Sequence, residues 1–261
     1  MNISMIGFGN MAKAIAHGLS HDKTNVLRVA SPSLPIGINE AGIKTHPNNL
    51  AIAESAEVLI LAVKPAQMAA VLAEISPVLP VNCLIISIAA GLKLDWLAER
   101  LRPGTAIVRA MPNIAAQVGQ AATPLMANEW VTVLQKKETD QIFSSIGLST
   151  WLHHECDIET FTALSGSGPA YVFFFMESMI RAAVELGLTE ETAKTFTLQT
   201  VKGALSLASV SELSLADLRK KVTSPAGTTA AAIDVLIKQG LDKLIAAAVQ
   251  AAHERACSLG I

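Results

Sequence analysis

Short β-rich runs that alternate with helical segments make up the first part of the chain, and this alternation limits the fold more than any other feature. It is typical of a parallel, doubly wound sheet covered by helices on both faces. Each expected strand ends in a loop of small or polar residues, and in such a sheet these loops meet at the ligand cleft. We predict strands at residues 3–6, 26–30, 58–63, 84–87 and 106–109, completed by runs at 121–126 and 149–153.

The pattern changes near Glu155, where strand signals give way to helical periodicity. We therefore predict an α/β domain over residues 1–154 and an all-helical domain over residues 155–261. The run from Ala170 to Leu186 is apolar on more than one face, and a helix of that kind has to be buried. A small helical domain offers few places to bury it, so we expect this domain to dimerise. The alternative is that the run packs wholly under the first domain.

A glycine-rich turn follows the first strand directly. The segment Gly7-Phe8-Gly9-Asn10-Met11-Ala12 matches the G-x-G-x-x-A pattern and leads into a helix expected over residues 11–19. Gly7 permits the tight turn, Gly9 admits a pyrophosphate close to the backbone, and Ala12 lets helix and strand pack closely. In this context the turn predicts a Rossmann-type dinucleotide-binding domain.

The loop after the second strand bears on which dinucleotide is bound. A NAD enzyme places Asp or Glu there to accept hydrogen bonds from the ribose, whereas this chain has Ala30-Ser31-Pro32-Ser33. Ser31 and Ser33 are able to donate hydrogen bonds to a 2′-phosphate, so the loop favours NADP over NAD. The alternative is that both serines are turn residues around Pro32.

Two further strand-end loops carry candidate cofactor residues. Lys64, in Val63-Lys64-Pro65, is placed to reach the phosphates or the nicotinamide ribose, or else it is an ordinary surface lysine. The segment Ala89-Ala90-Gly91 is small enough for a nicotinamide ring to lie flat against the backbone, although small residues also suit helix packing.

A polar loop in the second domain, Thr223-Ser224-Pro225-Ala226-Gly227-Thr228-Thr229, stands directly before an apolar helical run. The first turn of a helix has unpaired N–H groups and a partial positive charge, and Gly227 allows a ligand close to the backbone. Such a loop suits a small carboxylate. The alternative is a helix capped by Ser or Thr after a proline turn.

Composition narrows the class of partner. A net charge of −2 without a long basic run argues against nucleic acid or a membrane surface and favours a small molecule. The three cysteines are read as buried thiols of a reducing cytosol, and His153-His154-Glu155-Cys156 lacks the spacing of a zinc site. We expect no signal peptide, no membrane span, no metal and a cytoplasmic location.

Five segments in order resemble the motifs of the pyrroline-5-carboxylate reductase family, and the resemblance covers nearly the whole chain. They are Ile6 to Ala12, Ala62 to Pro65, Arg109 to Asn113, Leu164 to Tyr171 and Val222 to Thr229. The resemblance implies NAD(P)H-dependent reduction of Δ1-pyrroline-5-carboxylate to L-proline, the final step of proline biosynthesis. It also implies NADPH as cofactor with NADH possible, an interlocked homodimer and a larger ring such as a decamer. Interlocked helices would place the substrate loop of one chain over the cofactor cleft of the other, and we expect a shared site, which the sequence leaves open.

Roles for individual residues follow from the same resemblance. Thr229 would meet the ring nitrogen as the catalytic residue, and the loop around Ser224, Gly227 and Thr228 would hold the substrate carboxylate. The implied cofactor contacts are Ile6, Gly7, Phe8, Gly9, Asn10, Met11, Ser31, Ser33, Asn49, Ala62, Val63, Lys64, Pro65, Ile88, Ala89 and Ala90. Two departures from the family pattern stand out, Ala226 in place of a second glycine and Ala115 in place of a proline.

Two rival interpretations share the first domain. A β-hydroxyacid dehydrogenase would need a lysine as acid or base on the helix after the linker, and residues 170–179 contain none. A non-catalytic dinucleotide-binding regulator would not need the intact polar loop before residue 230.

Overall fold

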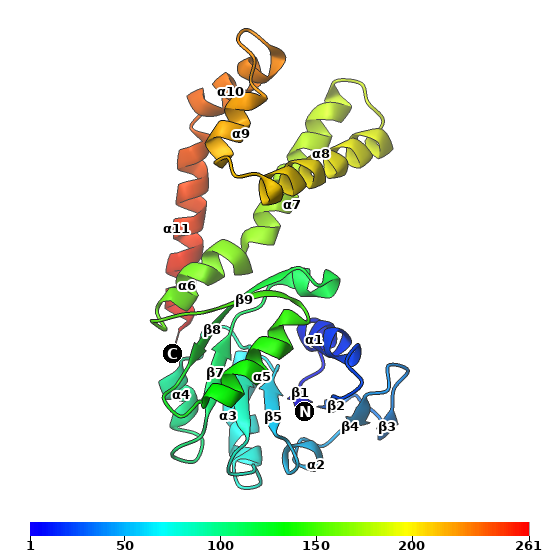
Figure 1. Cartoon of the computed structure of the whole chain (residues 1–261), viewed down its shortest axis with the longest axis vertical. Coiled ribbons are helices and arrows are strands. Elements are labelled where there is room, and N and C mark those ends of the chain that lie inside the picture. The colour runs from blue at the N-terminus through cyan, green and yellow to red at the C-terminus, as the bar shows by residue number, and fades with distance from the viewer. Residues whose placement is uncertain (261) are drawn as a thin grey trace. The chain divides into compact units, whose positions relative to one another are not determined.

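A computed structural model describes residues 1–260, which form two compact units (Figure 1). The first, called here the α/β unit, contains residues 1–167 together with residues 252–260. The second, the helical unit, contains Gly168–Ala251. The domain limits predicted from the sequence, 1–154 and 155–261, stay a prediction, because compact units defined by contacts need not coincide with domains.

The α/β unit is built on one sheet, which within the described residues has nine strands in the order β3-β4-β2-β1-β5-β6-β7-β8-β9. The strands are β1 (Asn2–Ile6), β2 (Val26–Ala30), β3 (Gly37–Ile38), β4 (Lys44–His46), β5 (Val58–Leu61), β6 (Leu84–Ser87), β7 (Ile107–Ala110), β8 (Ala121–Ala127) and β9 (Gly147–Trp151). The run from β4 to β7 is parallel throughout and has the strand order of a Rossmann fold, which confirms the predicted fold class.

Helices cover both faces of this sheet. They are α1 (Asn10–Ser20), α2 (Leu50–Ala53), α3 (Pro65–Ile75), α4 (Leu94–Ala98), α5 (Val133–Ser144), α6 (Asp157–Phe161), the 3₁₀ helix η1 (Ile114–Val118), the π-helix η2 (Thr162–Gly166) and the last turns of α11 (Leu241–Leu259). Successive residues of β5 belong to different cores: Ile60 packs with α1 and α5, whereas Leu59 and Leu61 pack with α3. The central strands are therefore buried on both sides, as parallel strands usually are.

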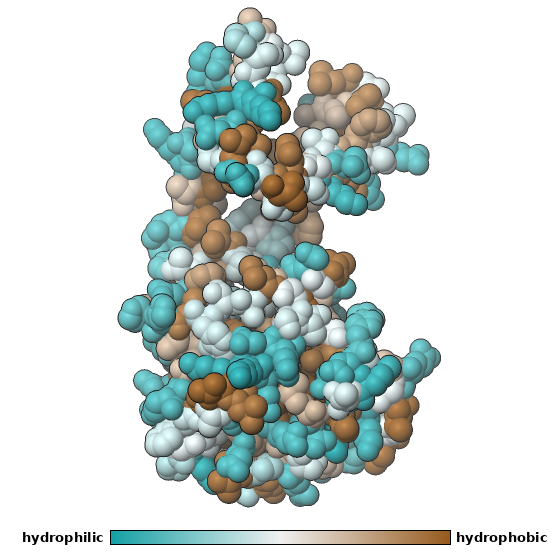
Figure 2. Space-filling view, viewed as in Figure 1, coloured by the Kyte–Doolittle hydropathy of each residue, from teal (hydrophilic) through white to brown (hydrophobic). Residues whose placement is uncertain are grey.

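The helical unit contains α7 (Gly168–Glu185), α8 (Glu190–Val210), α9 (Leu215–Lys221), α10 (Thr228–Lys238) and α11 as far as residue 251. Among its residues only Ala193 and Thr197 are buried, whereas Phe173 and Phe174 are 59% and 66% exposed. Figure 2 shows hydrophobic side chains at the surface of these helices. The apolar face expected for residues 170–186 is present, and this unit does not bury it. In the described part of the chain no helix is long and apolar enough to cross a membrane.

The cysteines correct one expectation. Cys83 is buried, and this burial raises the pKa of its thiol to about 12. Cys156 and Cys257 are exposed, so the interpretation of all three as buried thiols is wrong. Cys156 immediately precedes the short helix α6, and Cys257 lies on α11. Both are surface positions, which the usual burial of cysteine does not predict.

Candidate functional site

The turn after β1 can be made only by glycine. Gly7 has φ +88°, and a Cβ atom there would lie 2.7 Å from the carbonyl oxygen of Ala62. Its N–H donates to the carbonyl oxygen of Ala30 at the end of β2, over 2.8 Å. Gly7 is thus held between the ends of the two strands that flank β1, as the G-x-G-x-x-A interpretation requires.

Backbone hydrogen bonds link the neighbouring strand-end loops into one rim. Ala62 N–H donates to Ile6 at 2.8 Å, and Ile88 N–H donates to Leu61 at 3.1 Å. The predicted cofactor residues at Ile6–Met11, Ala62–Pro65 and Ile88–Ala90 therefore lie at the carboxyl ends of three adjacent strands. This is where a doubly wound sheet binds its ligand.

Helix α1 begins with an open N-terminus at this rim. Its N-cap residue is Gly9, no side chain caps its first turn, and a Cβ on Gly9 would meet no atom within 4 Å. The first-turn N–H groups of α1 therefore face open space and have the geometry to bind a pyrophosphate. Helix α5, by contrast, is closed by a capping box between Thr132 and Gln135.

The loop after β2 brings its two serines together. The hydroxyl oxygens of Ser31 and Ser33 lie 3.4 Å apart, and Ser31 N–H donates to the carbonyl oxygen of His46 over 3.1 Å. The His46 side chain in turn accepts from Asn48 N–H through Nδ1, over 2.9 Å. The side chain of Asn49, another predicted cofactor residue, donates to Glu74 at 2.8 Å. Sequence reasoning missed His46 because strand β4 was not expected.

The loops after β5 and β6 differ in their side chains: the first has an exposed lysine, and the second has small residues held by close contacts. Lys64 is exposed at the N-cap of α3, with Pro65 in the first turn, so its ammonium group is free to reach toward a ligand. Ala89 N–H is held by the hydroxyl of the buried Ser87 at 3.4 Å. Gly91 has φ +79°, and a Cβ there would lie 2.5 Å from the carbonyl oxygen of Leu259 at the end of α11. Close packing thus makes residue 91 a glycine.

The polar loop of the helical unit leads into α10, whose N-cap residue is Gly227 and whose first turn has no side-chain cap. The sequence left open whether this loop is a Ser- or Thr-capped helix start or a carboxylate site. A Ser or Thr cap is absent, because such a cap would bind these N–H groups. Thr228 and Thr229 are the first two helical residues, and within residues 1–260 their hydroxyl groups make no hydrogen bond. A Cβ on Gly227 would collide with the Ser224 hydroxyl.

Ala226 takes the left-handed conformation, with φ +57°. Among the described residues it is the only one other than glycine with a positive φ. The loop therefore has the backbone shape that a glycine adopts without strain, and alanine holds it at a cost of about 1 kcal/mol. The departure from the family pattern therefore lies at a position whose backbone conformation favours glycine.

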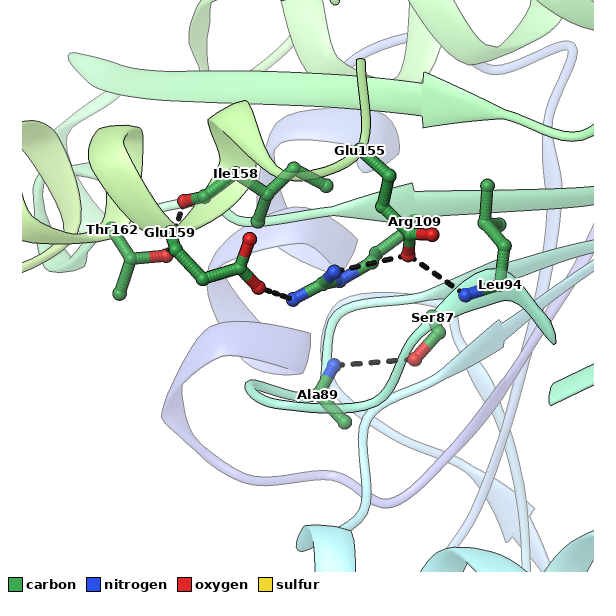
Figure 3. Close-up of polar contacts among 8 residues, drawn as sticks. All are labelled: Ser87, Ala89, Leu94, Arg109, Glu155, Ile158, Glu159 and Thr162. Atoms are coloured by element: carbon green, nitrogen blue, oxygen red, sulfur yellow. Dashed lines mark hydrogen bonds and ion pairs between the residues drawn. The ribbon is translucent and has the colours of Figure 1, made fainter. Parts of the chain in front are cut away.

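In the segment Arg109 to Asn113, at the end of β7, the first and last side chains are held by contacts within the chain. Arg109 is 3% exposed and pairs with Glu155 at 3.0 Å and Glu159 at 2.8 Å (Figure 3). Asn113 donates to the carbonyl oxygen of Ser165 at 2.8 Å. Glu155 is thus engaged in an ion pair, and no group of three His, Cys, Asp or Glu side chains able to hold a metal occurs within residues 1–260.

The fold and the rim of loops define a dinucleotide-binding oxidoreductase with a Rossmann domain and a second, helical domain. One family model, described as NADP oxidoreductase, coenzyme F420-dependent, matches residues 2–91, and another, described as pyrroline-5-carboxylate reductase dimerisation, matches residues 155–259. The chain belongs to the pyrroline-5-carboxylate reductase family.

Several similar proteins support this assignment. The chain is 39% identical over 262 residues to a pyrroline-5-carboxylate reductase of Pseudomonas aeruginosa, covering 98% of this chain and 96% of the relative. A solved pyrroline-5-carboxylate reductase from Coxiella burnetii superposes with a TM-score of 0.92 at 41% identity, covering 100% of this chain and 98% of that one. The Plasmodium falciparum enzyme, solved with NADP bound, has a TM-score of 0.91 at 32% identity, with coverage of 100% and 98%.

Proposed function

We propose that this protein reduces Δ1-pyrroline-5-carboxylate to L-proline with NADPH, and that Thr229 activates the substrate. The observation that carries the assignment to Thr229 is the open start of α10, where two hydroxyl groups and the first-turn N–H groups are unpaired within the described chain. Neither rival interpretation is favoured, because the relatives named above are reductases of this one family.

The α/β unit fits the cofactor on the evidence of its own geometry. The open N-terminus of α1 suits the pyrophosphate, the serine pair at Ser31 and Ser33 suits a 2′-phosphate, and the small side chains of Ala89 and Ala90 leave room for a flat ring. NADPH, when bound, supplies the hydride. NADH stays a possible second donor, since these loops contain no group that would reject it.

The substrate loop matches the two demands of a cyclic imino acid. The first-turn N–H groups of α10 and the partial positive charge of its N-terminus would hold the carboxylate. The Thr229 hydroxyl would donate to the ring nitrogen and so make the C=N carbon a better hydride acceptor. Hydride addition to that carbon and proton uptake by nitrogen convert the imine to the secondary amine of proline. The chain's part is mainly positioning and hydrogen bonding.

We infer that the protein works as a homo-oligomer in the cytoplasm. The exposed apolar face of α7 and the match to a dimerisation family over residues 155–259 support a homodimer. A decamer and a substrate loop supplied across the dimer are proposals from family resemblance. Light scattering would measure the assembly number. Mixed dimers of a variant defective in the loop and one defective in the cofactor rim would test the shared site, because only a shared site restores activity.

The decisive experiment measures NADPH consumption with pyrroline-5-carboxylate. We expect Thr229→Ala to lower kcat on the order of 10-fold to 1,000-fold with little change in NADPH affinity, because the imine loses its hydrogen-bond donor. Thr229→Ser keeps the hydroxyl and should restore most of the rate. Thr228→Ala is the matched control, since it removes the neighbouring hydroxyl and keeps the backbone N–H. Unchanged kinetics in Thr229→Ala would remove this residue from the mechanism, and activity on 3-hydroxy acids alone would overturn the proposed function.

A further inference from the structure

A buried cluster of three charges lies beside the cofactor rim. Arg109 on β7 donates to Glu155 through Nη1 and to Glu159 through Nη2 (Figure 3). The side chains of Arg109 and Glu159 are 4% and 8% exposed, and that of Glu155 is 23% exposed. One guanidinium cannot neutralise two carboxylates, and a buried carboxylate needs further hydrogen bonds. The cluster therefore requires a second donor.

That second donor is a backbone N–H group at the start of α4. The same Glu155 oxygen that accepts from Arg109 also accepts from Leu94 N–H, over 2.8 Å (Figure 3). Glu155 thereby connects the end of β7 to the first residue of α4. Within residues 1–260, the Glu159 carboxylate binds Arg109 and has no second contact of this kind.

Helix α4 follows directly after the loop Ile88–Lys93. Contacts at its start, middle and end hold this loop. At the start, Ile88 N–H donates to Leu61 and Ala89 N–H donates to Ser87; in the middle, Leu259 packs against Gly91; at the end, Leu94 N–H donates to Glu155. Of these, the bond from Glu155 is the only one made by a charged group. Ala89 and Leu92 are also buried in the core, so Glu155 fixes the end of the loop at Leu94, and Arg109 orients Glu155.

We propose that Glu155 and Arg109 are positioning residues for hydride transfer, acting through Leu94 on the loop that faces the nicotinamide. This inference rests on the proposed function, which places Ala89 and Ala90 against that ring. Neither charged residue reaches the rim itself, since both are occupied within the cluster. Misplacement of a reacting group by about 1 Å costs on the order of 100-fold in rate, so a small shift of this loop would be measurable.

Two alanine variants separate positioning from stability. Glu155→Ala removes one carboxylate from Arg109 and also frees Leu94 N–H, whereas Glu159→Ala removes one carboxylate and leaves the Leu94 bond in place. Both variants should lower Tm. We expect only Glu155→Ala to lower kcat, about 10-fold to 100-fold, with the KM for NADPH changed less than 3-fold. Glu155→Gln keeps an oxygen acceptor for Leu94 and should recover much of the rate.

Two further measurements, a kinetic isotope effect and amide hydrogen exchange, complete the test. With deuterium at the transferred position of NADPH, the isotope effect on kcat should rise in Glu155→Ala, because hydride transfer becomes slower relative to other steps. Amide hydrogen exchange at residues 88–94 should be faster in Glu155→Ala and unchanged in Glu159→Ala. Equal kinetic losses in both alanine variants, or a lower Tm with wild-type kcat in Glu155→Ala, would overturn the proposal.

Failure of the proposed function gives a different result. In that case the wild-type protein would not oxidise NADPH with pyrroline-5-carboxylate. The hydrogen exchange measurement needs no substrate, so it still tests whether Glu155 holds the loop. Equal exchange at residues 88–94 in the two alanine variants would refute the positioning contact by itself.

Discussion

The α/β unit buries its large apolar side chains, whereas the helical unit exposes them. In the α/β unit, large residues such as Leu59 and Phe143 are fully buried, in cores on opposite sides of the sheet. In the helical unit, α7 has no buried residue, and Phe174 is 66% exposed. One unit carries its own core, and the other presents the surface from which a core could be made with a second copy.

This difference separates two sources of stability. Burial within one chain stabilises a fold at any protein concentration, whereas burial between chains depends on concentration through mass action. The three tryptophans, Trp96, Trp130 and Trp151, all lie in the α/β unit, and the one tyrosine, Tyr171, lies in the helical unit. Tryptophan fluorescence therefore reports on the self-contained unit alone, and circular dichroism reports strongly on the helical one.

The largest effect is expected from Phe143→Ala in the α/β core. Loss of a fully buried ring from between α5 and the sheet should cost about 3–5 kcal/mol, because the surroundings only partly fill the cavity. Urea unfolding followed by tryptophan fluorescence measures this loss, which should not vary with protein concentration. Phe143→Leu is the control and should cost much less. A cost of the alanine variant below 1 kcal/mol would show that this core is not the main support of the unit.

The next largest effect is expected from Phe174→Asp on α7. A charge placed on the exposed apolar face of α7, which we propose as the subunit interface, should weaken association at least 100-fold, about 3 kcal/mol. Sedimentation across a concentration series measures it. The control is Val133→Asp, which places the same charge at a 75% exposed apolar residue of the α/β unit. If both variants dissociate equally, or neither does, the contrast between the two units fails.

Ser31→Asp probes the cofactor end and should leave the oligomer unchanged. A carboxylate beside Ser33 would repel a 2′-phosphate, and we expect the KM for NADPH to rise about 10-fold while the KM for NADH changes little. Steady-state kinetics with both cofactors measure the difference. Equal effects on the two cofactors would show that this loop does not read the 2′-phosphate.

The smallest effect is expected from Ala226→Gly in the substrate loop. Glycine takes a φ of +57° without strain, although it also loses more backbone freedom on folding. The balance should raise stability by about 0.5 kcal/mol, seen as a slightly higher Tm by circular dichroism. Ala226 lies in the helical unit, which has almost no core of its own. A lower Tm of Ala226→Gly would mean that contacts of the Ala226 side chain stabilise the loop by more than the backbone strain costs.

Local patterns were sufficient to predict most of the α/β unit. Strands β1, β2, β5 and β6 follow apolar runs bounded by turn residues, and Gly7 and Gly9 occur where a strand, a tight turn and a helix must join. The short strands β3 and β4 were missed because they have only two and three residues and lack a continuous apolar run. β4 pairs with β2 and β3 pairs with β4, so both strands depend on contacts with neighbouring segments more than on their own sequence.

Contacts between distant residues were beyond sequence reasoning. Arg109 was expected as the last residue of a strand, and nothing in the sequence indicated its partners, which lie 46 and 50 residues further along the chain. No periodicity connects an arginine at a strand end with two acids near a later helix. The substrate loop was easier, because Gly227 before a helical run is a local signal, but only the structure showed that no side chain caps α10.

The return of α11 to the α/β unit has a consequence for how the protein is made. Leu259, which packs on Gly91, is added to the growing chain 168 residues later than Gly91. The Rossmann sheet is therefore synthesised long before Leu259, a neighbour of the loop Ile88–Lys93, exists. During translation the loop Ile88–Lys93 lacks its contact with Leu259 until α11 has left the ribosome. We therefore expect the complete cofactor site to form only after that point. Stalled ribosomes carrying chains that stop before α11 should consequently show weak NADPH binding.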